Sequence, residues 1–132
     1  MAKKFNFNVK VYYEDTDSGG VVYYANYLKF LERARSEAIY SLGFTNSGLL
    51  EKNNILLIVK SCNIEYKKPA KFEDKLNIVS EVTSFTKTSF IVQQNILRND
   101  ELITTAEVHI VVVDKIGKPS KLPDELKLKL QN

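Results

Sequence analysis

A cluster of acidic and small residues near the start of the chain has the residue types that could do chemistry. Glu14, Asp15 and Asp17 lie close together and are followed by Gly19 and Gly20. A carboxylate can attack a carbonyl carbon, or it can take a proton from a water molecule that attacks instead. Both roles require an ionised group, which is the usual state of an aspartate near neutral pH. The cluster therefore has catalytic potential, although the same pattern also fits a solvated turn.

A helix is expected directly after this cluster. Its apolar positions recur at intervals of three or four residues and comprise Tyr27, Leu31, Ala34, Ala38 and Leu42. We predict Asn26 as its N-cap and Gly43 as the residue that ends it. A helix beginning near Tyr24 would offer unsatisfied backbone N–H groups at the positive end of its dipole, where they could stabilise an oxyanion.

The elements around this region predict an α+β fold. Apolar and polar residues alternate over residues 5–11, which indicates a half-buried strand. After a predicted loop at residues 46–48, four more strands are expected at residues 55–66, 75–84, 89–97 and 102–113, joined by short polar turns. Pro123 could start a short terminal helix. One helix would cover one face of an antiparallel sheet, and pairing with a second subunit would protect the exposed sheet edges.

Composition indicates a single soluble domain over residues 1–132. Hydrophobic residues make up 44% and charged residues 27%, as in ordinary globular proteins. The net charge of +3 is spread along the chain, which argues against nucleic acid as a partner. The longest apolar run, residues 55–59, is too short to span a membrane. The single cysteine, Cys62, fits a reducing compartment, so we expect a cytoplasmic protein.

The stretch VYYEDTDSGGVVYYANYLKFLERARSE resembles the signature of the hotdog-fold thioesterases. The likeness is to the 4-hydroxybenzoyl-CoA thioesterase family, and in particular to its bacterial acyl-CoA thioesterase branch associated with Tol-Pal genes. The matching positions are Tyr13, Asp15, Asp17, Gly20, Val21, Val22, Tyr23, Tyr24, Asn26 and Tyr27. The similarity continues through KSCNIEYKKPAKFEDKL and TSFTKTSFIVQQNIL. It implies a long central helix wrapped by a curved antiparallel sheet of about five strands, in a homodimer or homotetramer with active sites between subunits.

The resemblance also implies the reaction. It is the hydrolysis of an acyl-CoA thioester with a short, medium or aryl acyl group, and the reactive carboxylate is placed at Asp17, as nucleophile or general base. Asp15 is then expected only to cap or hydrogen-bond the loop. Gly20, counted among the substrate-binding residues, would together with Gly19 let the backbone turn tightly between the acid and the helix N–H groups. Tyr24 would contribute its main-chain N–H, while Tyr13 would position the substrate or simply pack.

Family members bind the phosphate end of CoA partly with the turn between the third and fourth strands. Here the turn and the residue after it comprise Thr86, Lys87, Thr88 and Ser89, which also fit a plain solvated turn. Leu57, Ile58 and Val59 would line the pantetheine tunnel or belong to the sheet core. No cofactor is expected, because CoA is part of the substrate.

Several other interpretations remain open. The Tol-Pal-associated branch generally carries His where this chain has Tyr24, and the 4-hydroxybenzoyl branch can carry Tyr there.

A rival function is a weakly catalytic or non-catalytic dimer that binds an acyl-carrier protein. A dehydratase would need a catalytic histidine, and His109 lies outside the motif. His109 and Cys62 have no motif around them, and no cluster with metal-ligand spacing is present. Arg33, Arg35 and Glu37 are expected to form ion pairs on the helix surface.

Overall fold

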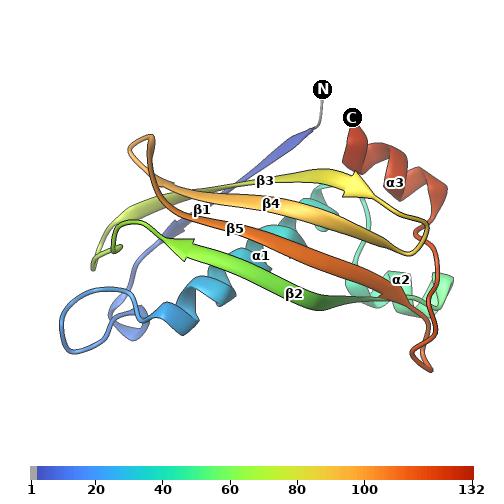
Figure 1. The fold of residues 1–132 in the computed structure, drawn as a ribbon, viewed down its shortest axis with the longest axis horizontal. Coiled ribbons are helices and arrows are strands. Elements are labelled where there is room, and N and C mark those ends of the chain that lie inside the picture. Colours follow the sequence, from blue (N-terminus) through green and yellow to red (C-terminus); the bar gives the residue numbers. More distant parts are fainter. Residues whose placement is uncertain (1–2) are drawn as a thin grey trace.

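The computed structural model describes residues 3–132, which form one five-stranded antiparallel sheet and three α-helices (Figure 1). The strands are β1 (Lys4–Lys10), β2 (Leu56–Tyr66), β3 (Lys75–Phe85), β4 (Ser89–Arg98) and β5 (Glu101–Val113). They lie in the order β1-β3-β4-β5-β2. The helices are α1 (Tyr24–Ser41), α2 (Asn46–Asn53) and α3 (Asp124–Gln131). The α+β plan predicted from the sequence is therefore confirmed, with strand ends within about a residue or two of the prediction.

The core lies between α1 and the sheet, since α1 runs across one face of the curved sheet (Figure 1). Its inward face includes Phe30 and Leu31, both 0% exposed. In β4 the buried positions alternate with partly exposed ones, as the period of two requires. Helices α2 and α3 lie toward one end of the sheet, where β3 turns into β4.

The two ends of α1 differ in how well the sequence predicts them. At its end, Gly43 has φ +89° and its N–H donates to Tyr40 O, while Phe44 N–H donates to Ile39 O. This is a Schellman motif, so the prediction for Gly43 is confirmed. The predicted N-cap is wrong: the helix starts at Tyr24 with Tyr23 as N-cap, and Asn26 lies inside the first turn.

The predicted loop at residues 46–48 is also wrong, because these residues start α2. The side chain of Thr45 accepts a hydrogen bond from Gly48 N at 2.9 Å, which caps the helix. Asn54 ends it in the left-handed conformation at φ 56°. Leu49 is buried, so tertiary packing stabilises a helix whose own sequence, with Gly48 inside, favours it poorly. The terminal helix predicted after Pro123 is present as α3.

Strand β2 forms one edge of the sheet and pairs only with β5 in the described chain. It is eleven residues long, and its exposed side chains include Ile58 and Val59, at 44% and 45% exposed. Long apolar edges invite pairing with another chain. Separately, no helix within residues 3–132 has the length and apolar character to cross a membrane.

Candidate active site

Asp17 lies in a tight turn with its carboxylate exposed. Its backbone N–H donates to Val21 O at 2.9 Å, and Gly20 N–H donates back to Asp17 O at 3.1 Å. One carboxylate oxygen, Oδ1, accepts a hydrogen bond from Gly19 N at 2.8 Å. The other, Oδ2, has no hydrogen-bond donor among residues 3–132. Gly20 has φ +78°, a conformation that L side chains rarely adopt, so the turn needs glycine there. The carboxylate is thus oriented through one oxygen and available through the other.

Asp15 hydrogen-bonds within the loop, as the sequence predicts. Its Oδ2 accepts from Tyr12 N at 2.9 Å. Its main-chain oxygen accepts from Tyr23 N at 3.1 Å and from Asn26 Nδ2 at 2.8 Å. Asp15 therefore links the loop to the start of α1, and it is partly buried whereas Asp17 is exposed.

The first turn of α1 provides hydrogen-bond donors close to this loop. An isolated antiparallel bridge between Thr16 and Val22 closes the loop directly before the helix. Tyr23 caps the helix without any side-chain hydrogen bond, and neither Tyr24 N–H nor Ala25 N–H finds an acceptor within the described chain. Free N–H groups at a helix N-terminus suit a developing negative charge. The arrangement can therefore combine a carboxylate with an oxyanion site.

Tyrosine rings surround the loop and the helix start. Tyr13 stacks on Phe72 with a ring-centroid distance of 3.9 Å, yet it remains 77% exposed. Tyr24 lies 5.6 Å from Tyr66, measured between ring centroids, and Tyr66 Oη donates to Tyr24 O at 3.3 Å. Tyr27 is buried, and its hydroxyl oxygen accepts from Ala70 N at 3.0 Å. Burial raises the pKa of Tyr27 above its ordinary value of 10.0.

The residues predicted to bind CoA lie at the other end of the sheet. Lys10 pairs with Lys75, so the Asp17 loop adjoins the first residue of β3, whereas residues 86–89 follow its last residue. A strand of this length separates the two groups by roughly 30 Å. Leu56 pairs with Val113, which places the start of β2 at the same distant end. One chain therefore does not bring Asp17 together with residues 57–59 and 86–89.

The turn that contains Lys87 borders a small hollow of ≈ 140 Å³. Thr86 Oγ1 and Ser89 Oγ lie 2.6 Å apart, and Lys87 projects into solvent. The hollow is also lined by Lys121 and Lys127, with Asp124 the acidic residue among its walls. Sequence reasoning missed these two lysines, since nothing in their local pattern indicates that the chain end folds back onto the turn.

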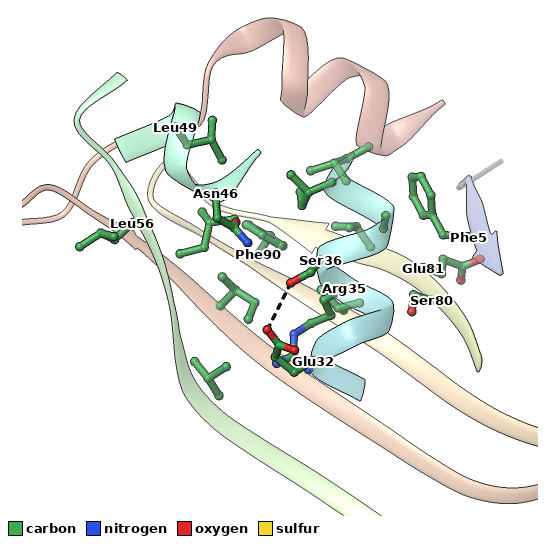
Figure 2. Close-up of a pocket in the computed structure, with 18 of the residues that line it drawn as sticks. Phe5, Glu32, Arg35, Ser36, Asn46, Leu49, Leu56, Ser80, Glu81 and Phe90 are labelled. Atoms are coloured by element: carbon green, nitrogen blue, oxygen red, sulfur yellow. Dashed lines mark hydrogen bonds between the residues drawn. The ribbon is translucent and has the colours of Figure 1, made fainter. Parts of the chain in front are cut away.

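A larger cavity of ≈ 350 Å³ lies between α1 and the start of β2 (Figure 2). Leu57 and Val59 line it, but Ile58 does not. Only two of the three residues predicted for the pantetheine tunnel therefore line this cavity. Part of the polar lining comes from α1, where Ser36 Oγ donates to Glu32 Oε1 at 3.3 Å, as Figure 2 shows, and Asn46, Ser80 and Glu81 supply the rest together with Arg35.

The expectation that Arg35 forms an ion pair on the surface of α1 is wrong. Arg35 points inward, where its Nη1 donates to Gln94 Oε1 at 3.0 Å, and burial lowers its pKa. Gln94, 0% exposed, donates in turn to Leu31 O and Ser80 Oγ. No ion pair between Arg33 and Glu37 occurs among those of residues 3–132.

Cys62 and His109 do not form a catalytic pair. Ser61 pairs with His109 and Cys62 with Val108, so the Cys62 and His109 side chains face opposite sides of the sheet. Burial raises the pKa of the Cys62 thiol, which disfavours the reactive thiolate. Within residues 3–132, no group of three or more His, Cys, Asp or Glu side chains could hold a metal ion.

Comparison with known proteins connects this geometry to a family. The model of the Thioesterase-like superfamily matches residues 11–130, which includes the whole Asp17 loop and strands β2 to β5. The chain belongs to this superfamily. It is 42% identical over 125 residues to "Acyl-CoA thioesterase YbgC" of Haemophilus influenzae, covering 93% of this chain and 91% of that protein.

Solved structures support the same assignment. A probable thioesterase from Bartonella henselae superposes with a TM-score of 0.88 at 34% identity, covering 92% of this chain and 100% of the other. The structure of a 4-hydroxybenzoyl-CoA thioesterase mutant, complexed with 4-hydroxybenzoyl-CoA, superposes with a TM-score of 0.89 at 19% identity, covering 98% of this chain and 100% of the other. The second likeness concerns the fold. Together these matches confirm the hotdog fold predicted from the opening motif.

Proposed function

We propose that the protein is an acyl-CoA thioesterase, with Asp17 as its reactive carboxylate. The observation that carries this proposal is the exposed Asp17 carboxylate, which Gly19 N–H holds through Oδ1. Within residues 3–132 its Oδ2 has no donor, and the N–H groups of Tyr24 and Ala25 at the start of the following helix have no acceptor. The chain that contains this loop is 42% identical to a protein named acyl-CoA thioesterase. Hydrolysis at this site requires no cofactor beyond the CoA that the substrate carries.

The chemistry follows from these two features. Asp17 Oδ2 either attacks the thioester carbonyl, which breaks the C–S bond, releases the CoA thiolate and forms a mixed anhydride that water then hydrolyses, or takes a proton from the water whose attack releases that thiolate. In both routes the carbonyl oxygen becomes negatively charged, and the N–H groups of Tyr24 and Ala25 stabilise that charge. The exposed rings of Tyr13 and Tyr24 provide apolar surface for a short, medium or aryl acyl group.

A second subunit would complete the site. If the edge strand β2 pairs antiparallel with its copy about a two-fold axis, the Leu57 end of one strand lies beside the Tyr66 end of the other. Residues 57–59 and 86–89 of one subunit would then approach Asp17 of its partner. We therefore propose a homodimer, alone or within a tetramer, in which Lys87 contacts the CoA phosphates. We also place the protein in the cytoplasm, where a lone thiol such as Cys62 stays reduced.

The rival proposal is a dimer that only binds an acyl-carrier protein. Binding alone does not account for a carboxylate oxygen and helix N–H groups that lack partners within the described residues, and the relatives named thioesterases favour hydrolysis. An acyl-carrier thioester could still serve as a second substrate of the same site.

The experiment that tests the function is a panel of acyl-CoA substrates, straight-chain and aryl, with thiol release as the readout. The wild-type chain should hydrolyse at least one of them. Glu14→Gln is a matched control for Asp17→Asn, because Glu14 is an exposed acid in the same loop. Activity that Asp17→Asn retains in full would refute the role of Asp17, and an inactive wild-type protein would refute the proposed function.

A further inference from the structure

The Asp17 loop rests on the segment formed by residues 67–74, which joins β2 to β3. Val22 N–H donates to Ala70 O at 2.8 Å, and Phe72 N–H donates to Gly20 O at 3.3 Å. An isolated antiparallel bridge joins Val21 to Lys71 between these two contacts. The position of the loop therefore depends on the position of this supporting segment.

The supporting segment is fixed from the end of β4 by Arg98. Arg98 Nη1 donates to Pro69 O at 2.9 Å and to Asp74 Oδ2 at 2.8 Å. Asp74 Oδ2 also accepts from Lys71 N at 2.8 Å. One guanidinium thus joins the start and the end of the segment, and through Asp74 it reaches the residue that pairs with Val21.

Arg98 is itself held in place. Its Nη2 donates to Glu101 Oε1 at 3.3 Å, and Glu101 also pairs with Lys68. The side chains of Arg98 and Asp74 are 21% and 23% exposed, so their contact is better shielded than the Lys68 contact, where the lysine is 57% exposed. The hydrogen bond to Asp74 raises the pKa of Arg98, and those from Lys68 and Arg98 lower the pKa of Glu101.

We propose that Arg98 is a positioning residue for the reaction, acting on Asp17 through the supporting segment. The inference rests on the proposed thioesterase function. Among the hydrogen bonds and ion pairs of residues 3–132, the Arg98 side chain has none to the Asp17 loop. It sets where Ala70 O and Phe72 N–H lie, and these groups set where the Asp17 carboxylate lies. A displacement of about 1 Å in such a group can lower a rate by about a hundredfold.

The chain offers a matched control for this proposal. Arg98→Met and Lys68→Met each remove one positive charge that pairs with Glu101. Lys68 lies within the supporting segment, but its side chain pairs with Glu101 alone among residues 3–132, whereas Arg98 contacts both Pro69 O and Asp74. We expect Arg98→Met to lower kcat at least tenfold with KM within about threefold, and Lys68→Met to leave kcat within about twofold. Asp74→Asn should lower kcat similarly, and the double variant should lose little more.

Amide hydrogen exchange gives a readout that does not depend on catalysis. In Arg98→Met the amides of Val22 and Phe72 should exchange at least tenfold faster, while those of Val92 and Val108 in the sheet keep the wild-type rate. If Arg98→Met fails to fold, Asp74→Asn replaces it in both measurements. If the wild-type chain hydrolyses no acyl-CoA, the proposed function fails and the exchange rates alone decide the positioning claim. Unchanged exchange at Val22 and Phe72, or an equal loss of kcat in Lys68→Met, would overturn the proposal.

Discussion

The side-chain amide of Asn26 donates to the main-chain oxygen of Asp15 at 2.8 Å, and this bond ties the first turn of α1 to the Asp17 loop. The same oxygen accepts Tyr23 N–H at 3.1 Å, so the loop and the helix start are joined twice at one atom. The carboxylate and the helix N–H groups are therefore held as one unit, which is what a site needs if both must act on one carbonyl group.

Asn26→Ala should loosen that unit. The variant loses one partly buried hydrogen bond, which lowers the free energy of unfolding by about 1 kcal/mol. We expect a larger proportional effect on the reaction, with kcat reduced about tenfold and KM nearly unchanged, because orientation matters most in the transition state. Steady-state kinetics and urea unfolding measure the two effects. Asn53→Ala, at an exposed position in α2, serves as the control. A wild-type kcat in Asn26→Ala would show that the Asp15 contact is dispensable.

Asp17 and Tyr24 should respond differently to substitution. Asp17→Asn keeps the shape but removes the nucleophile or base, so kcat should fall on the order of 100-fold or more. Tyr24 contributes its main-chain N–H, which Tyr24→Phe leaves in place, so that variant should retain most of the rate. Kinetics on the best substrate of the panel make the comparison, with circular dichroism to confirm folding. Equal collapse of both variants would instead assign a catalytic role to the Tyr24 phenol.

The sequence predicts the elements of this fold better than it predicts their relations in space. All four long strands are found because alternating patterns such as residues 89–97 report directly on one buried face. Helix α2 is missed because Gly48 lowers its helix propensity and its stability comes from the burial of Leu49. Arg35 is misplaced on the surface, since its partner Gln94 lies far along the chain.

For the candidate site, too, the sequence predicts local structure better than the relation between distant segments. The local motif places Asp17, Gly20 and the start of α1 in one loop, because these residues are neighbours in the chain. It does not reveal that residues 57–59 and 86–89 lie at the opposite end of the sheet, since strand order and direction set that distance. The sequence likewise does not predict that Lys121 and Lys127 lie beside the turn that contains Lys87, because the tertiary fold brings the end of the chain there.

Tyr27 should make stability depend on alkaline pH. Because burial raises its pKa above 10.0, the folded state holds the phenolic proton more tightly than the unfolded state. The resulting stability is fully present below about pH 10 and is lost as the pH rises through the folded-state pKa. Tyr27→Phe also loses the contact with Ala70 N–H, so at pH 7 it should be less stable by about 1 kcal/mol. Urea unfolding should show this gap closing above pH 10. Exposed Tyr40→Phe is the control, and a gap that stays constant with pH would contradict the prediction.

Lys87→Ala should raise KM for acyl-CoA more than it lowers kcat. A contact with the phosphates, far from the carbonyl, stabilises the ground state and the transition state alike. Lys115→Ala removes the same charge from an exposed turn that does not border the 140 Å³ hollow, so it controls for net charge. The measurement is made at low salt, where charge contacts are least screened. Unchanged KM in Lys87→Ala would remove this turn from the site.

Two inactive variants should restore activity to each other if the site is shared between subunits. Asp17→Asn removes the carboxylate, and Leu57→Arg places a charge in the wall of the 350 Å³ cavity at the other end of the sheet. In a mixed dimer, the Asp17 of the Leu57→Arg chain faces the intact Leu57 of its partner, so one of the two sites is whole. Random reassociation of an equal mixture makes half of the dimers mixed, which predicts at most about a quarter of wild-type activity. Sedimentation must first show that each variant remains oligomeric. If the mixture stays inactive although mixed dimers form, each site belongs to one chain, and pairing through β2 does not build it.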